Sequence, residues 1–256
     1  MIHRSAVVHS GAKLAPDVEI GPFAVIGEHV EIDSGTSIGS HTVIAGHTRI
    51  GKGNRIFHHS VLGEAPQDKK YAGEPTRLEI GDGNTIREFC TFNTGTAQDV
   101  GTTRLGDDNW VMAYVHLAHD SQVGSHTILA NMVTLAGHVS IEDHVILGGG
   151  TMVHQFCRVG VHAFTAGGSI VLRDVPPFVM ASGNSAEPHG INVEGLKRRG
   201  FRAEAIEEIR RAYKTLYKSG LPLEEAKAAL REQAASCQEL EVFVEFLDSS
   251  TRSIIR

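Results

Sequence analysis

The chain has 256 residues, 41% of them hydrophobic, and a formal net charge of −6, so it has ample material for a core and no general basic field to attract nucleic acid. The first residues, MIHRSAVVHSG, lack the apolar run of a signal peptide, and no later stretch has a membrane-spanning length, so we expect a cytoplasmic protein. Three widely spaced cysteines fit neither a disulfide framework nor a Cys-x-x-Cys metal site.

The N-terminal part of the chain repeats with a period of six. Every sixth position is Ile, Val or Leu: Ile2, Val8, Leu14, Ile20, Ile26, Ile32, Ile38, Ile44, Ile50, Ile56 and Leu62. A period of six matches neither an α-helix nor a simple alternating strand. It is typical of hexapeptide repeats, in which three short strands and turns make one triangular coil of about 18 residues. We therefore expect a β-helix whose aliphatic side chains fill the prism.

Two segments interrupt the repeat, one near residues 63–77 and one near 93–104. The repeat resumes at Ile80 and, after a shift of one residue, continues as Leu105, Val111, Leu117, Val123, Leu129, Leu135, Ile141, Leu147, Val153 and Val159. Both interruptions are predicted to be loops that project from the prism, and long loops on compact scaffolds often carry function.

Helical spacing replaces the hexads after about residue 185. Gly200 and Gly220 bracket a predicted helix, a second is expected to begin near Pro222, and a third is expected to cover 240–247. The chain is therefore predicted to consist of a β-helix domain, 1–186, and a small α-helical domain, 187–256.

The repeat also sorts the histidines. Three of them are spaced by one coil and are predicted to form an outward column that needs no ligand: His126, His144 and His162. Four others are expected to gather on one face across successive coils: His116, His119, His138 and His154. Such a face is compatible with a zinc site, with a general base or with ordinary surface histidines, and the residues alone leave all three open.

Several motifs outside the hexads resemble the UDP-N-acetylglucosamine acyltransferase family: QDKKYAGEPTRLEIG, LAHD, LAGHV, VHQFC, DVPPFVMASGN and NVEGLKRRGF. The resemblance implies a left-handed parallel β-helix followed by a small helical domain, an exception to the right-handed crossover rule. It also implies transfer of an (R)-3-hydroxyacyl group from acyl carrier protein to the glucosamine 3-hydroxyl of UDP-N-acetylglucosamine, which starts lipid A synthesis. Family members are cytoplasmic homotrimers with sites between neighbouring prisms, and no cofactor or metal is implied.

The resemblance carries catalytic roles to three residues. His119 is expected to be the general base, Asp120 its acidic partner, and the Gly137 N–H the oxyanion donor. Adjacent residues on a strand face opposite ways, so Asp120 can orient the imidazole only where the backbone bends.

The resemblance further implies substrate-binding roles for residues in the first loop, in the cleft and near the start of the helical domain. These are Gln67, Asp68, Lys70, His116, His138, His154, Gln155, Gly167, Asn192, Glu194, Arg198 and Arg199. Gly167 corresponds to a position that sets acyl length, where glycine leaves the groove open. A basic patch, Arg198, Arg199, Arg202, Arg210, Arg211 and Lys214, is expected to attract the acidic carrier protein. The chain has Asn93-Thr94-Gly95-Thr96 where many relatives have His-Arg-Gly-Thr.

Two other functions compete with this interpretation. The nearest is a UDP-3-O-acylglucosamine N-acyltransferase, which shares the hexads and a histidine base, but the NVEGLKRRGF block favours the O-acyltransferase. A zinc-dependent carbonic anhydrase of the same fold is the other, and it predicts stoichiometric metal.

Overall fold

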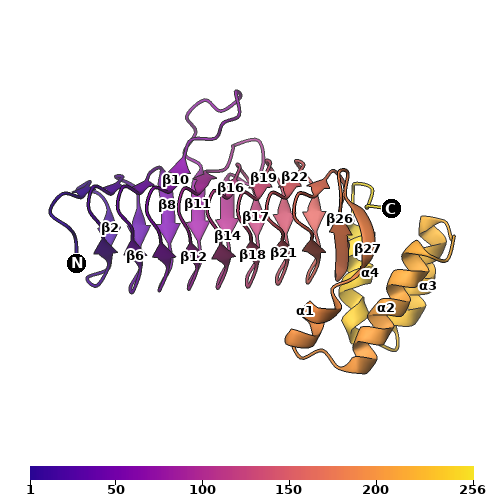
Figure 1. Ribbon diagram of the computed structural model, residues 1–256. Helices are drawn as coiled ribbons and strands as arrows, with labels where there is room; N and C mark the ends of the chain where they lie inside the picture. The colour runs from indigo at the N-terminus through magenta and orange to yellow at the C-terminus, as the bar shows by residue number, and fades with distance from the viewer.

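The computed structural model describes residues 1–256 as a prism of stacked coils that ends in a cluster of helices (Figure 1). The strands of each coil belong to three different sheets, and each strand pairs in parallel with its equivalents in neighbouring coils. The fold is therefore a parallel β-helix, as the six-residue period predicts.

Most strands are only two residues long. The first sheet contains β1 (Val7–Val8), β4 (Val25–Ile26), β7 (Val43–Ile44), β10 (Val61–Glu64), β13 (Thr91–Asn93), β16 (His116–Leu117), β19 (Thr134–Leu135), β22 (Met152–Val153) and β25 (Ile170–Val171). The second contains β2 (Lys13–Leu14), β5 (Glu31–Ile32), β8 (His47–Ile50), β11 (Arg77–Ile80), β14 (Thr102–Leu105), β17 (Gln122–Val123), β20 (Ser140–Ile141) and β23 (Arg158–Val159).

The third sheet contains β3 (Glu19–Ile20), β6 (Ser37–Ile38), β9 (Arg55–Ile56), β12 (Thr85–Ile86), β15 (Trp110–Val111), β18 (Ile128–Leu129), β21 (Ile146–Leu147), β24 (Phe164–Thr165), β26 (Val179–Ser182) and β27 (Glu187–Ile191). The last pair is antiparallel, unlike all the others. This pair closes the C-terminal end of the prism.

The aliphatic residue of each hexad points inward. From Ile20 to Val159 every position of both predicted series is at most 3% exposed, whereas Ile2, in the end coil, is half exposed. Buried asparagine and threonine side chains satisfy backbone groups at one corner: the Asn84 amide donates to Asn54 Oδ1 and to the Gly106 carbonyl, at 3.0 and 2.9 Å. This corner is therefore stabilised by hydrogen bonds as well as by packing, and the hydrogen bonds satisfy the polar groups that are buried there.

Both interruptions of the repeat are loops. One joins β10 to β11 and the other joins β13 to β14, and they extend from the same edge of the prism in Figure 1. Asn93 Nδ2 donates to the Ala65 carbonyl at 2.9 Å, and Thr76 Oγ1 donates to Thr94 Oγ1 at 3.1 Å, so the two loops support each other. Asn93 and Thr94 therefore both take part in the contacts between the two loops.

The C-terminal helices are α1 (Val193–Arg198), α2 (Ala203–Tyr217), α3 (Leu223–Ala234) and α4 (Glu241–Ser249), with a 3₁₀ turn at Gln238–Leu240. The three longer helices lie where the sequence predicts them, but α1 and the β26–β27 pair were not expected. Strand β27 continues the third sheet past residue 186, and the division into domains 1–186 and 187–256 stays a prediction.

Candidate functional site

His119 and Asp120 form a pair at a corner between the first and second sheets. Asp120 has a φ of 59°, so the chain turns sharply and the two consecutive side chains meet, with His119 Nδ1 3.0 Å from Asp120 Oδ2. This is the bend that a His–Asp pair of adjacent residues requires. The carboxylate keeps the proton on Nδ1 and leaves Nε2 as the basic nitrogen.

Residues of the second loop hold the Asp120 carboxylate. Thr96 donates its backbone N–H to both oxygens at 3.0 Å and its hydroxyl to Oδ2 at 2.6 Å, while the backbone N–H of Asp120 donates to Thr103 Oγ1 at 2.8 Å. The aspartate is only 1% exposed. Bonds from Thr96 offset the cost of burying this charge and fix its direction. The sequence did not reveal this partner.

His138 lies beside His119. The two rings are perpendicular with centroids 4.9 Å apart, and the His138 ring stacks on Phe156 at 4.3 Å. Its Nδ1 lies 2.5 Å from Asp99 Oδ2, a second partner that the sequence did not reveal, and 3.8 Å from Asp120 Oδ2. The corner therefore contains two imidazoles and two carboxylates.

Gly137 touches the imidazole of His119. A Cβ at this position would lie 2.5 Å from Cε1 and 2.7 Å from Nε2 of His119, so any larger residue would displace the ring. Gly137 is a buried residue, and its N–H has no hydrogen-bond partner within the chain. A free N–H donor thus lies next to the basic nitrogen, as an oxyanion donor requires.

The other residues predicted to line the site are held less tightly. His116 Nδ1 lies 2.8 Å from Thr91 Oγ1, and burial lowers the pKa of His116, with the nearby His119 adding to the effect. His154 and Gln155 are exposed on the next coil, and no contact joins His154 to the other three histidines. Of the four histidines predicted to share one face, His119 and His138 are in direct contact, and His116 lies near His119. Gly167 is exposed, and a Cβ there would meet only the Gly149 carbonyl, at 3.3 Å.

The first-loop residues lie apart from this corner. Asp68 accepts a hydrogen bond from the Lys70 backbone at 2.9 Å and shapes a turn, while Gln67 and the Lys70 side chain are exposed. No hydrogen bond or ion pair joins these residues to His119 or His138. One chain alone does not bring them together.

Helix α1 carries the remaining predicted binding residues. Asn192 caps the helix by accepting from the Gly195 N–H at 3.1 Å, and its amide donates to the His162 carbonyl at 3.1 Å. Both the oxygen and the nitrogen of this side-chain amide are therefore already hydrogen-bonded within the chain. Glu194 pairs with Lys197, and Arg198 is exposed without a partner.

Of the expected basic patch, Arg202, Arg210 and Arg211 are each paired with a glutamate, which leaves Arg198, Arg199 and Lys214 free of ion pairs.

The column of His126, His144 and His162 is confirmed, but it lies at a corner rather than on a flat face. The rings stack at 5.0 and 4.7 Å, each residue has a positive φ near 60°, and Phe178 and Phe201 close the upper end. Arg199 donates to the His126 carbonyl at 3.3 Å. The expectation of a purely outward column is wrong for His162, because the segment around α1 covers it and leaves it 9% exposed.

We expect this column to make the protein less stable in mild acid. Burial, with smaller contributions from His144 and Arg199, lowers the pKa of His162 to about 4, against about 6.5 in an unfolded chain. Between these values only the unfolded chain binds the proton, so stability falls as the pH drops, by roughly 1–2 kcal/mol at pH 5. Thermal unfolding at pH 7 and pH 5 measures the effect. The variant His162→Phe keeps the stack and is expected to lose part of the pH dependence, whereas His9→Phe, at an exposed site, should keep all of it.

One group of side chains has the composition of a metal site. His119, Asp120 and His138 each offer a ligand atom, and these atoms lie within 4.8 Å of one another. Two imidazoles and a carboxylate suit zinc. In this structure, however, His119 Nδ1 is already bonded to Asp120 Oδ2, and the same oxygen accepts a hydrogen bond from the Thr96 hydroxyl. This arrangement is suited to orienting a base.

We therefore expect turnover to be independent of added metal. For the acyl transfer that the resemblance implies, dialysis against a chelator should leave the rate within about twofold of the untreated rate, because a histidine base acting on a thioester needs no Lewis acid. Metal analysis of the dialysed protein is the companion measurement. Loss of activity that zinc restores would contradict this interpretation.

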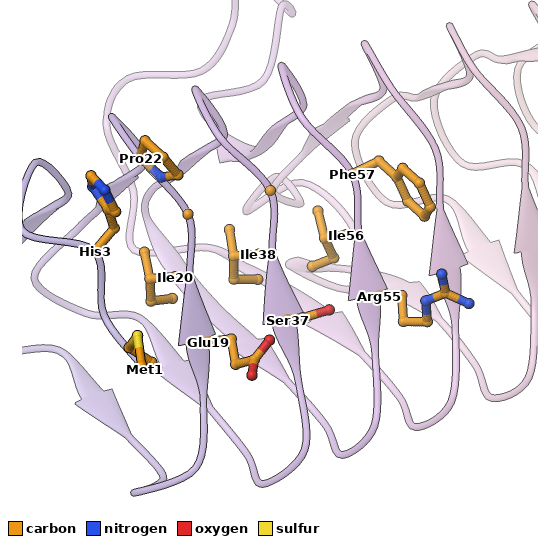
Figure 2. A pocket seen from close by; sticks show the side chains of 12 residues that line it. Met1, His3, Glu19, Ile20, Pro22, Ser37, Ile38, Arg55, Ile56 and Phe57 are labelled. Atoms are coloured by element: carbon orange, nitrogen blue, oxygen red, sulfur yellow. The ribbon is translucent and has the colours of Figure 1, made fainter.

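A hollow of about 420 Å³ lies on the third sheet at the N-terminal end of the prism (Figure 2). Ile20, Ile38 and Ile56 stand in a row along its floor, with Arg55 and Phe57 at one end. It contains none of the predicted site residues and lies several coils away from His119. This hollow is therefore separate from the corner that holds His119, Asp120 and His138.

Comparisons with known proteins identify the family. Residues 174–255 match the model described as Udp N-acetylglucosamine O-acyltransferase, domain 2, and residues 102–137 match the bacterial transferase hexapeptide model. An acyl-[acyl-carrier-protein]--UDP-N-acetylglucosamine O-acyltransferase from Thiobacillus denitrificans is 62% identical, over 100% of this chain and 99% of the relative. The chain belongs to the UDP-N-acetylglucosamine O-acyltransferase family.

Solved structures of this family superpose along the whole chain. The UDP-N-acetylglucosamine acyltransferase of Francisella novicida is 47% identical, with a TM-score of 0.98 and coverage of 100% of this chain and 94% of the other. The LpxA of Bacteroides fragilis is 41% identical, with a TM-score of 0.96 and full coverage of both chains. The predicted fold class, a left-handed parallel β-helix followed by short C-terminal helices, is confirmed, and the protein is an acyltransferase. No helix is long and apolar enough to span a bilayer.

Proposed function

We propose that the protein transfers an (R)-3-hydroxyacyl group from acyl carrier protein to the 3-hydroxyl of the glucosamine in UDP-N-acetylglucosamine, the first step of lipid A synthesis. The observation that carries the proposal is the His119–Asp120 pair, braced by Thr96, in a member of this acyltransferase family. The names of the relatives favour this function over the N-acyltransferase and the carbonic anhydrase that the sequence left open.

The proposed reaction begins with proton transfer to His119. Nε2 takes the proton from the sugar 3-hydroxyl as that oxygen attacks the thioester carbonyl. Asp120 keeps the Nδ1 proton in place and stabilises the imidazolium that forms. The carbonyl oxygen becomes an oxyanion beside the Gly137 N–H. When the tetrahedral intermediate collapses, the C–S bond breaks, the thiolate leaves, and the imidazolium returns the proton to it.

Substrate contacts in this proposal come from three places. His116, His138, His154 and Gln155 line the cleft, and the open site at Gly167 accommodates a long acyl chain. Glu194, Arg198 and Arg199 contact the nucleotide, where guanidinium groups suit phosphate oxygens. Asn192 acts mainly by holding α1 in place, because its amide is already hydrogen-bonded. The free cations Arg198, Arg199 and Lys214 attract the acidic carrier protein.

A homotrimer completes the proposed site. Asp68 and Lys70 lie on a projecting loop that makes no contact with His119 in its own chain, so a neighbouring subunit supplies them. The reaction is proposed to take place in the cytoplasm, where free thiols such as Cys90 and Cys157 stay reduced.

Mass spectrometry of the purified protein with UDP-N-acetylglucosamine and a panel of acyl carrier protein thioesters tests the function. The expected product is the 3-O-acylated sugar nucleotide, formed from 3-hydroxyacyl donors and not from their unhydroxylated counterparts. Acylation of an amino sugar in place of the hydroxyl, or no product with any donor, would overturn the proposal.

A further inference from the structure

The ring of His138 is restrained on two sides, but these contacts leave its orientation incomplete. Phe156 stacks against it with an interplanar angle of 4°, and His119 meets it edge-on. Stacking fixes the plane of an imidazole but does not choose between its two flipped orientations, because a half-turn about the Cβ–Cγ bond preserves the plane. That half-turn exchanges the positions of the nitrogen and carbon atoms. A directional hydrogen bond is needed to choose between the two orientations.

Asp99 makes this choice. Its Oδ2 lies 2.5 Å from His138 Nδ1, across 39 residues of sequence, and the His138 side chain is only 14% exposed. A carboxylate accepts here, so Nδ1 carries the proton. Nε2 has no hydrogen-bond partner within the chain. The free nitrogen therefore belongs to a ring that is held in a fixed orientation beside His119.

We propose that Asp99 is a positioning residue for acyl transfer: it fixes the orientation and tautomer of His138 so that Nε2 is presented to the substrate. The inference rests on the proposed function. Asp99 itself touches no reacting atom and acts through His138.

The loop that carries Asp99 makes this role specific. Thr96 and Asp99 lie in the same turn, where the Asp99 N–H donates to the Thr96 carbonyl at 3.3 Å. The loop thus holds both imidazoles: Thr96 acts on His119 through Asp120, and Asp99 acts on His138 directly. His138 Nδ1 is also 3.8 Å from Asp120 Oδ2. Without Asp99, that carboxylate is the nearest acceptor left for His138.

A double-mutant cycle between Asp99 and His138 tests the proposal. Asp99→Ala is expected to lower kcat/KM about tenfold, the effect of losing a hydrogen bond to a charged group at a half-exposed site. In a His138→Ala background the same substitution should change kcat/KM by less than about twofold, because a residue that acts through His138 has nothing left to position. Asp99→Asn should fall between wild type and Asp99→Ala, since its amide oxygen still accepts from Nδ1.

Asp108→Ala is the matched control, because Asp108 faces another corner histidine, His126, at 3.8 Å and lies outside the cleft. It should leave kcat/KM near the wild-type value. Equal losses from Asp99→Ala in both backgrounds would assign Asp99 a merely structural role and overturn the proposal, as would wild-type activity in Asp99→Ala. If Asp99→Ala does not fold, the cycle is run with Asp99→Asn. Failure of the wild-type protein to transfer an acyl group in the same assay would instead overturn the proposed function.

Discussion

Replacing His119 with alanine is expected to lower the rate of acyl transfer by about 10²–10⁴-fold, the usual contribution of a positioned general base. The sugar hydroxyl is a poor nucleophile at neutral pH, so its attack on the thioester slows when the proposed base is removed. Asp120 cannot replace the base, because this carboxylate is buried and its oxygens are held by Thr96. Single-turnover measurements with saturating UDP-N-acetylglucosamine separate the chemical step from binding.

Two control measurements show whether the loss of activity comes from the loss of the base. The oligomeric state and the melting temperature should be unchanged, because the imidazole of His119 lies outside the hydrophobic core of the prism. His126→Ala is the matched histidine control, since this side chain is exposed at a different corner, and its turnover should stay near that of the wild type. Near-normal turnover of His119→Ala would refute the assignment of the base. A large loss of turnover in His126→Ala would show that the reaction depends on the His126 corner instead.

The repeat made much of this arrangement predictable. A period of six identifies the buried position of each coil, so the sequence predicts that His119 and His138, one coil apart, lie near each other. The same logic places His126, His144 and His162 in a column. It works because each coil is bonded to the next in a fixed register, so separation along the chain translates directly into position.

The parts that were not predictable lie where the repeat stops. Thr96 and Asp99 belong to an insertion whose path is set by its own turns, so no spacing rule links them to Asp120 or His138 across 24 and 39 residues. Helix α1 is six residues long, too short to show a helical period. The segment around α1 also covers His162, a long-range contact that the column itself does not reveal.

Gly137→Ala is the second substitution expected to have a large effect, about 10²-fold on kcat with a smaller change in KM. The added methyl would lie 2.5 Å from Cε1 of His119, closer than real side chains approach, so the imidazole must move. That movement weakens the 3.0 Å bond to Asp120 and takes Nε2 away from the sugar hydroxyl. A misplacement of about 1 Å is enough to cost this much.

Gly27→Ala is the matched control, because a Cβ there meets the Ile44 carbonyl at 3.3 Å and the Ala45 Cα at 3.4 Å, several coils away from His119. Gly137 has no positive φ, so alanine is tolerated by the backbone at that position, and the loss should come from the side-chain clash rather than from unfolding. Its effect should therefore nearly vanish in a His119→Ala background, where the space is empty. A Gly137→Ala loss that persists undiminished without the imidazole would mean that the oxyanion donor, and not the position of the base, is what the methyl group disturbs.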